Sequence, residues 1–314
     1  MKKIINIVII LGMCLMLLSG CKSNKSNSLV IVTTNFVGYD FARAVVGDED
    51  VEIKMLLKPG TDAHQYEPTP KDIKSINDAD IFIYVGGESE EWVSDILEDL
   101  DSEDTKVIKM MDIVNLKEEE IKEGMEEEAE EEEEEEEEAE YDEHVWTSPK
   151  NAILIVKEIE DKLISIDEDN EEVYKENAEN YIGKLNKIDE EIREVVSNSK
   201  RKVLIFGDKF PLRYFVDEYG LDYYAAFPGC SSDTEASAKT ISFLINKVKK
   251  EKVPAVLKIE LSSGKIADTI ASETGVTVKT FNAVHNVSVD DFKAGITYVD
   301  YMNKNIEVLR EVLN

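Results

Sequence analysis

Short runs of β-branched and apolar residues alternate along the chain with stretches of helical pattern, and this alternation constrains the fold more than any other feature. The expected strands are residues 29–34, 51–57, 81–85, 106–110, 202–206, 255–259 and 276–280. The expected helices between them are residues 37–46, 70–78, 90–97, 212–218, 240–249 and 266–274. Because strands that alternate with helices form parallel sheets through crossover connections, we expect an α/β fold.

A long helical segment separates the two series of strands. Apolar residues recur every three or four positions over residues 153–163 and again over residues 181–195. Residues 167–170 break this pattern, which predicts two helices, the second from about residue 172 to residue 196. One further helix is expected over residues 289–309. The predicted division is an N-terminal α/β lobe (29–170), a linking helix (171–200) and a C-terminal α/β lobe (201–314).

The start of the chain has the pattern of an export signal. A basic beginning is followed by an apolar run over residues 4–18 and by small residues before Cys21. The run is shorter than the roughly twenty apolar residues that a membrane span needs. The sequence Leu-Ser-Gly-Cys resembles the lipobox of bacterial lipoproteins, which implies that residues 1–20 are removed and that Cys21 is lipidated. Residues 21–28 would then be a tether, which places the protein on the extracytoplasmic face of the cell membrane.

An acidic insert dominates the charge of the chain. Residues 118–143 hold 19 acidic residues and one lysine, so they carry −18 of the formal net charge of −32. A run of nine glutamates cannot bury apolar surface and repels itself, which predicts a solvated loop. The run is Glu130, Glu131, Glu132, Glu133, Glu134, Glu135, Glu136, Glu137 and Glu138. This run is interpreted either as a spacer or as a weak collector of cations. The negative net charge of the whole chain argues against nucleic acid as a partner.

The chain has three histidines, and each falls on a predicted loop. His64 lies in a turn-rich segment after a strand, His144 lies where the acidic insert meets the first long helix, and His285 follows the last predicted strand. Ligands of α/β proteins bind on such loops, beyond the carboxyl ends of the strands. A single loop histidine is more often a surface residue than a ligand, so these residues alone indicate no more than a candidate metal site.

Several short motifs are spread over nearly the whole mature chain. They are Lys58-Pro-Gly with His64 and Pro68-Thr-Pro70, Asp142-Glu-His144-Val-Trp with Ser148-Pro149, Tyr214-Phe215 with Tyr219-Gly220-Leu221, Glu260, Glu273-Thr-Gly275, and His285-Asn-Val with Thr297-Tyr298 and Met302. In this order they resemble the zinc and manganese solute-binding lipoproteins (cluster A-I) of bacterial ABC importers. The resemblance implies two α/β lobes joined by a rigid long helix, with the metal site between the lobes. It also implies delivery of the metal to a permease and its ATPase, and we expect a monomer.

The resemblance further implies that His64 and His144 are metal ligands. The family's third ligand, a His or Glu before the Tyr-Phe segment, has no counterpart here, and Asp208 is the nearest acceptor. Asp208 is interpreted either as a ligand or as a helix N-cap. His285 is the candidate replacement for the family's C-terminal acidic ligand, which gives a site of three histidines and one aspartate. Glu260 is the reserve ligand, or otherwise an acceptor that orients a histidine ring.

Zinc is the expected cargo. An imidazole-rich site with four ligands suits Zn²⁺, whereas Mn²⁺ prefers more oxygen ligands, and Ile296 stands where the manganese branch carries an aspartate. Because ligand histidines must be neutral, the affinity is expected to fall as the pH drops through roughly 6.5. Cys230, the one cysteine besides Cys14 and Cys21, is a further donor or, more usually for an isolated cysteine, a packed apolar residue.

Two other functions are kept as alternatives. A secreted zinc hydrolase would also use three protein ligands and leave a position for water. The sequence has no His-Glu-x-x-His helix and no Gly-x-Ser-x-Gly elbow, which argues against it. An adhesin, in which the exported lobes bind a host protein, has no positive sequence signal. We therefore expect a metal-binding protein that is not an enzyme.

Overall fold

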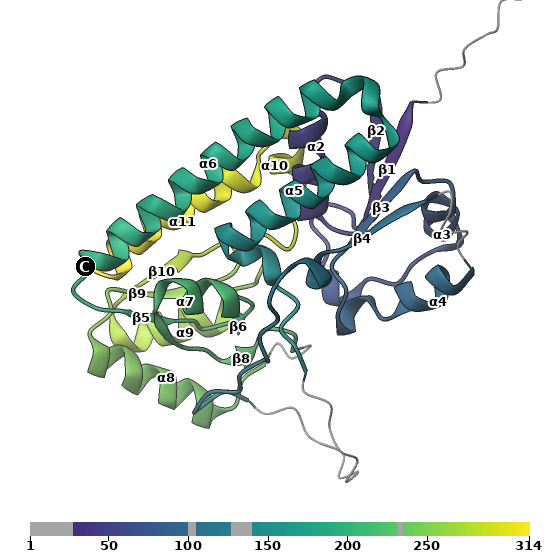
Figure 1. The fold of residues 1–314 in the computed structure, drawn as a ribbon. Coiled ribbons are helices and arrows are strands. Elements are labelled where there is room, and N and C mark those ends of the chain that lie inside the picture. The colour runs from purple at the N-terminus through teal and green to yellow at the C-terminus, as the bar shows by residue number, and fades with distance from the viewer. Residues whose placement is uncertain (1–27, 100–104, 127–139, 232–234) are drawn as a thin grey trace, which may run out of the picture.

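The computed structural model consists of two α/β lobes and a long helix that runs past both of them (Figure 1). It describes residues 28–99, 105–126, 140–231 and 235–314. The predicted export signal, the lipidation site Cys21 and the glutamate run 130–138 lie outside the described residues. Among the residues that are described, no helix has both the length and the apolar character needed to cross a bilayer.

The N-terminal lobe is built on one parallel sheet. Its strands are β1 (Leu29–Thr33), β2 (Val51–Met55), β3 (Ile81–Tyr84) and β4 (Lys106–Lys109), in the order β2-β1-β3-β4. Its helices are α2 (Phe36–Val46), α3 (Pro70–Asn77) and α4 (Trp92–Asp99), with the short helices η1 (Ala63–Gln65), η2 (Glu88–Glu90) and η3 (Met110–Ile113). All four residues of β3 are buried, as expected for a central strand covered on both faces.

The C-terminal lobe contains three short pairs of parallel strands. The pairs are β5 (Val203–Ile205) with β7 (Asp222–Tyr224), β6 (Lys209–Phe210) with β8 (Phe227–Pro228), and β9 (Ala255–Lys258) with β10 (Thr277–Thr280). A parallel bridge between Phe206 and Leu257 joins the first pair to the third. The helices of this lobe are α7 (Arg213–Tyr219), α8 (Ala238–Glu251) and α9 (Lys265–Thr274). The parallel sheets predicted from the alternation are confirmed in both lobes.

The long helical segment is also confirmed. It consists of η4 (Val145–Thr147), α5 (Pro149–Ile166), η5 (Glu168–Asn170) and α6 (Glu171–Ser197). The 27 residues of α6 span roughly 40 Å. Its buried side chains recur every three or four positions from Tyr174 to Val195, and they join a hydrophobic core that draws residues from both lobes. This shared core ties the lobes together, while the predicted lobe boundaries stay a prediction.

The single C-terminal helix predicted over residues 289–309 is wrong. The segment forms two helices, α10 (Val289–Ala294) and α11 (Tyr298–Val312), and α11 lies along α6 (Figure 1). Gly295 ends α10 in the left-handed conformation, at φ 72°, which glycine adopts readily. Thr297 then opens α11 through a capping box with Asp300.

The acidic insert is not a solvated loop at its described ends. The Glu119 carboxylate accepts a hydrogen bond from the backbone N–H of Cys230 at 3.1 Å, and the N–H of Glu126 donates to the Ala226 carbonyl at 2.9 Å. Met125 is buried and belongs to the shared core. An apolar side chain and backbone hydrogen bonds therefore dock residues 118–126 on the C-terminal lobe, which the charge count did not predict.

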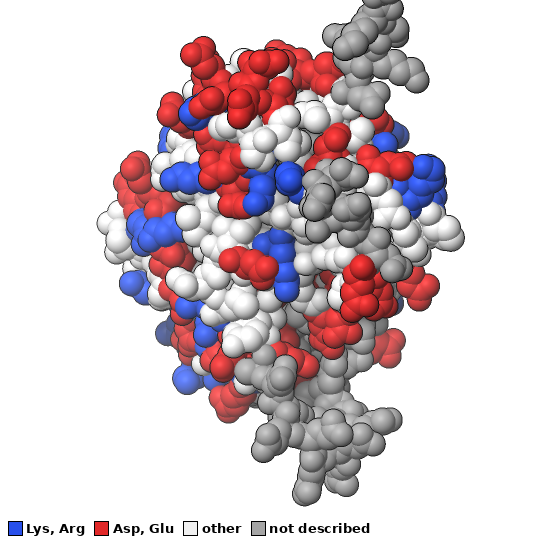
Figure 2. Space-filling view, turned by 45° about the vertical axis from the view of Figure 1, so that its right-hand side comes forward, with Lys and Arg blue, Asp and Glu red and all other residues white. Residues whose placement is uncertain are grey.

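The described surface carries both signs of charge. Figure 2 shows acidic side chains gathered toward the top of the view, with basic side chains scattered between acidic and uncharged ones. No continuous basic surface is visible among the described residues on this face. A nucleic acid would need such a surface to neutralise its phosphates.

Candidate metal site

His64 is carried on a tight loop that follows β2. It lies in η1, whose N-cap Asp62 accepts a hydrogen bond from the His64 backbone N–H at 3.1 Å. The preceding turn is tied to the C-terminal lobe, because the Asn286 side-chain amide donates to the carbonyls of Lys58 and Thr61 at 2.8 and 2.7 Å. The loop that bears His64 is thereby fixed to the loop that bears His285.

His144 is the most deeply buried of the three histidines. Its side chain is 0% exposed, against 10% for His64 and 13% for His285. Asp142 Oδ1 accepts the His144 backbone N–H at 2.8 Å and lies 3.0 Å from its Nδ1. The chain then turns through η4 into α5, where Ser148 caps the helix. The helix start therefore holds His144 in place from the C-terminal side, and Asp142 holds it from the other.

His285 lies on the loop after β10, where the backbone is strained. Val284 has φ 64°, which is rare for a β-branched residue. The Glu260 carboxylate spans this residue, accepting the backbone N–H groups of Ala283 and His285 at 2.7 and 2.9 Å. The Trp146 indole N–H donates to the Ala283 carbonyl at 2.8 Å. These three hydrogen bonds fix the backbone on both sides of the strained residue and so set the position of the His285 ring.

The three imidazole rings converge on one point. Their metal-ligating nitrogens lie within 4.8 Å of one another, and the ring centroids are 4.3–5.6 Å apart. Nε2 of each histidine is buried and has no hydrogen-bond partner. Buried polar atoms are rarely left without a hydrogen-bond partner, so an unpaired buried nitrogen indicates that an ion or another ligand binds there. Three unpaired nitrogens from separate loops are the strongest indication of a cation site in the described part of the chain.

Each ring also has a carboxylate on its Nδ1 side. Asp142 faces His144 at 3.0 Å, Glu143 Oε1 lies 3.6 Å from His64 Nδ1, and Glu260 Oε1 lies 3.8 Å from His285 Nδ1. Of these three contacts, only that of Asp142 is short enough for a hydrogen bond, which fixes the tautomer of His144 and leaves its Nε2 free to bind a metal. The sequence offered Glu260 as an acceptor that orients a ring but missed Asp142 and Glu143. Their position directly before His144 was the available signal.

The electrostatics of the site keep the imidazoles of His64 and His144 neutral. Burial, reinforced by the other two histidines, lowers the pKa of His64 to about 2, and burial lowers the pKa of His144 well below 6.5. Proton competition at these two residues should therefore begin well below the pH of roughly 6.5 predicted from unperturbed histidines. Burial also raises the pKa of both Asp142 and Glu143 to about 7. Neutral nitrogen donors in a desolvated site suit Zn²⁺.

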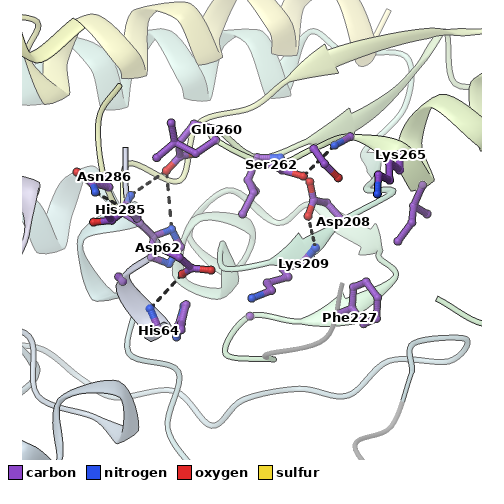
Figure 3. Close-up of a pocket in the computed structure, with 18 of the residues that line it drawn as sticks. Asp62, His64, Asp208, Lys209, Phe227, Glu260, Ser262, Lys265, His285 and Asn286 are labelled. Carbon is purple, nitrogen blue, oxygen red and sulfur yellow. Dashed lines mark hydrogen bonds and ion pairs between the residues drawn. The ribbon is translucent and has the colours of Figure 1, made fainter. Parts of the chain in front are cut away.

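Asp208 lies near the histidines without joining them. It lines, with His64 and His285, a cavity of about 310 Å³ that draws residues from both lobes (Figure 3). Its oxygens accept the backbone N–H groups of Lys209 at 2.9 Å and Ile259 at 3.2 Å. The alternative role as a helix N-cap is wrong, because α7 starts at Arg213 and has no side-chain cap. Ligation by Asp208 or by Glu260 stays a prediction.

The amino-acid sequence of the chain matches one family profile and several known proteins. The profile described as zinc-uptake complex component A, periplasmic (ZnuA), matches residues 31–312. The zinc-binding lipoprotein AdcA of Streptococcus pneumoniae R6 is 34% identical over 99% of this chain and 61% of its own length. The chain thus spans less than two thirds of that relative. The high-affinity zinc uptake system protein ZnuA of Bacillus subtilis 168 is 32% identical over 97% of this chain and 96% of its own.

The fold has a solved counterpart. The crystal structure of the Zn(II)-bound ZnuA-like domain of Streptococcus pneumoniae AdcA superposes with a TM-score of 0.74 at 33% sequence identity. The match covers 91% of this chain and 99% of that domain. The two-lobed architecture is therefore shared over nearly all of the described residues.

Proposed function

The chain belongs to the family of periplasmic zinc-uptake complex components A, and we propose that it captures Zn²⁺ outside the cytoplasmic membrane and delivers it to the permease of an ABC importer. The permease works with its ATPase, and the binding protein acts as a monomer anchored through Cys21. His64, His144 and His285 bind the metal. No catalytic turnover is part of this function.

One observation carries the proposal. The three histidines bring metal-ligating nitrogens within 4.8 Å of one another, each has a buried Nε2 without a hydrogen-bond partner, and each has a carboxylate within 3.8 Å of its Nδ1. This is a donor set that accepts Zn²⁺ through imidazole nitrogen, whereas Mn²⁺ favours oxygen. The relatives named for zinc binding and zinc uptake support the same cargo.

Calorimetric titration of the purified full chain tests the proposal. We expect one tight equivalent of Zn²⁺ and a large rise in the thermal unfolding midpoint, since a ligand at 1,000 times its Kd adds about 4 kcal/mol to stability. Mn²⁺ in the same titration should bind more weakly. Equal or tighter binding of Mn²⁺, or no stoichiometric binding of Zn²⁺, would contradict the proposed cargo.

Delivery needs a test in cells. Loss of the chain should slow growth in chelator-treated medium, and added zinc, but not added manganese, should restore it. A variant that carries alanine at all three histidines should fail to restore growth although it is exported. Growth that does not depend on the chain would contradict a role in uptake, whatever the protein binds in solution.

A further inference from the structure

Cys230 lies next to the three-histidine centre. It follows β8 in the C-terminal lobe, and its sulfur, one nitrogen of His144 and a carboxylate oxygen of Glu143 all lie within 4.8 Å of one another. The thiol also hydrogen-bonds to the backbone of Glu143. His144 thus belongs to two groups of metal-ligating atoms, and its Nε2 is fully buried and without a partner.

The backbone around Cys230 is fixed. Its N–H donates to Glu119 Oε1 at 3.1 Å. A Cβ added at Gly229 would lie 3.1 Å from the Phe210 carbonyl oxygen and 3.2 Å from Pro211 Cα, so the loop packs too closely there for a side chain to fit without displacement. Glycine at 229 and the Glu119 carboxylate together hold the sulfur beside His144.

Three carboxylates near the histidines accept hydrogen bonds through both of their oxygens. Those of Glu143 accept from the Ser89 hydroxyl and backbone N–H, and those of Glu260 accept from two backbone N–H groups. Asp208 accepts from the N–H groups of Lys209 and Ile259. A carboxylate oxygen keeps a second lone pair after it accepts one hydrogen bond, so these contacts orient the three carboxylates without excluding them as ligands. Outside this set, Cys230 is the residue of the described chain whose donor atom groups with a nitrogen of His144.

The chemistry of the metal favours a fourth, anionic donor. Structural and transport sites for Zn²⁺ are commonly tetrahedral, and His₃ supplies three neutral ligands. Burial and the carboxylates of Glu143, Glu119 and Asp142 raise the pKa of the Cys230 thiol, so metal binding itself must displace the thiol proton. A thiolate would complete the tetrahedron and offset one positive charge.

We infer that Cys230 is the fourth ligand of the metal, so that Zn²⁺ is held by the Nε2 atoms of His64, His144 and His285 and by the Cys230 sulfur. The thiol binds as thiolate and its proton passes to solvent. Because the sulfur shares only His144 with the histidine group, metal binding draws it toward His64 and His285. This inference rests on the proposed function, since it names a ligand of the same site.

X-ray absorption at the zinc edge tests the inference. The sample is the full chain with the substitutions C14S and C21S, loaded with one equivalent of Zn²⁺, so that Cys230 is its sole thiol. The expected spectrum contains one sulfur at about 2.3 Å in addition to nitrogen at about 2.0–2.1 Å. Adding Cys230→Ser should remove the sulfur shell and weaken zinc binding by about tenfold or more.

Each outcome separates the inference from the proposed function. Tight zinc binding with a shell of nitrogen and oxygen alone overturns the sulfur ligand and leaves zinc capture standing. A sulfur shell that survives Cys230→Ser also overturns it, because the sulfur must then belong to a methionine. Absence of tight zinc binding in the C14S/C21S chain contradicts the proposed function itself. The spectrum of the chain that retains Cys230 decides the question even if the serine variant does not fold.

Gly229→Ala gives a second, graded test. The added methyl group should displace the loop and reduce the sulfur contribution to the spectrum while all four ligand side chains remain. Cobalt in place of zinc offers an optical reading of the same bond, because a Co²⁺–thiolate pair absorbs in the near ultraviolet. An unchanged cobalt spectrum in Cys230→Ser would overturn the assignment.

Discussion

The two halves of the candidate site hold their histidines in different ways. In the N-terminal half, the residues Asp142 and Glu143 directly precede His144, and they face the Nδ1 atoms of His144 and His64. In the C-terminal half, Glu260 lies 25 residues before His285. It acts chiefly on the backbone, through two N–H groups that flank the left-handed Val284.

The two halves therefore position a metal-binding histidine in two different ways. Asp142 acts on the ring of His144, at 3.0 Å, as well as on its backbone N–H, at 2.8 Å, and both side chains are almost fully buried. Glu260 is 3.8 Å from the ring of His285 and stabilises a strained turn instead. Loss of a ring contact should therefore weaken metal binding directly, whereas loss of a backbone contact should first destabilise the fold.

His144→Ala should have the largest effect on zinc affinity. It removes the only ligand that belongs to both groups of metal-ligating atoms, and the loss should exceed the 10–100-fold that removal of an orienting carboxylate typically causes. His285→Ala should cost less, because that ring is partly exposed and water can replace its nitrogen. Competition with a chelator of known affinity measures both values. A larger loss for His285→Ala would reverse the proposed ranking of the two halves.

Asp142→Asn and Glu260→Gln compare the orienting groups directly. We expect Asp142→Asn to weaken zinc binding by about 10–100-fold. Glu260→Gln should have a smaller effect on affinity but should lower the stability of the metal-free protein by about 1–3 kcal/mol, because one of two backbone N–H groups loses its acceptor. Chelator competition and urea unfolding give the two quantities. Equal effects of both substitutions on both quantities would show that the halves do not differ.

The pH dependence of stability isolates His64. Burial lowers its pKa to about 2 in the folded metal-free protein, while the unfolded chain takes up a proton below about 6.5. The contribution of neutral His64 is therefore fully present above pH 6.5 and is lost as the pH falls. Between pH 7.5 and 5.5 the wild type should lose about 1.4 kcal/mol relative to His64→Gln. Urea unfolding with a zinc chelator at both pH values measures this, and a constant difference would contradict the burial of His64.

Removal of residues 127–139 should have the smallest effect on tight binding. The described ends of the acidic insert contact the C-terminal lobe through Glu119 and Glu126, so the deletion is confined to the segment between them. We expect the tight zinc site to remain unchanged while several weak equivalents disappear from calorimetric titrations. If the weak equivalents persist, the glutamate run does not collect cations and is a spacer.

The sequence predicted the α/β fold, pointed to the three histidines and offered Glu260 as an orienting acceptor, but it did not predict the contacts of Asp142 and Glu143 with the rings. The alternation of strands and helices can be read from short stretches of sequence, and so can the two motifs that contain His64 and His144. The approach of His285 to His144 depends on how the loop after β10 packs against Trp146, which no local pattern encodes. The break at Gly295 was missed because the apolar spacing continues across it. The docking of Met125 was missed because the neighbouring charge masks a single apolar residue.

A crystal of the zinc-loaded protein, measured on both sides of the zinc absorption edge, tests the central claim most directly. We predict one anomalous peak at about 2.0–2.1 Å from Nε2 of His64, His144 and His285. A peak that contacts Nδ1 instead, or that lies in the cavity beside Asp208 without contact to His144, would contradict the three-histidine centre.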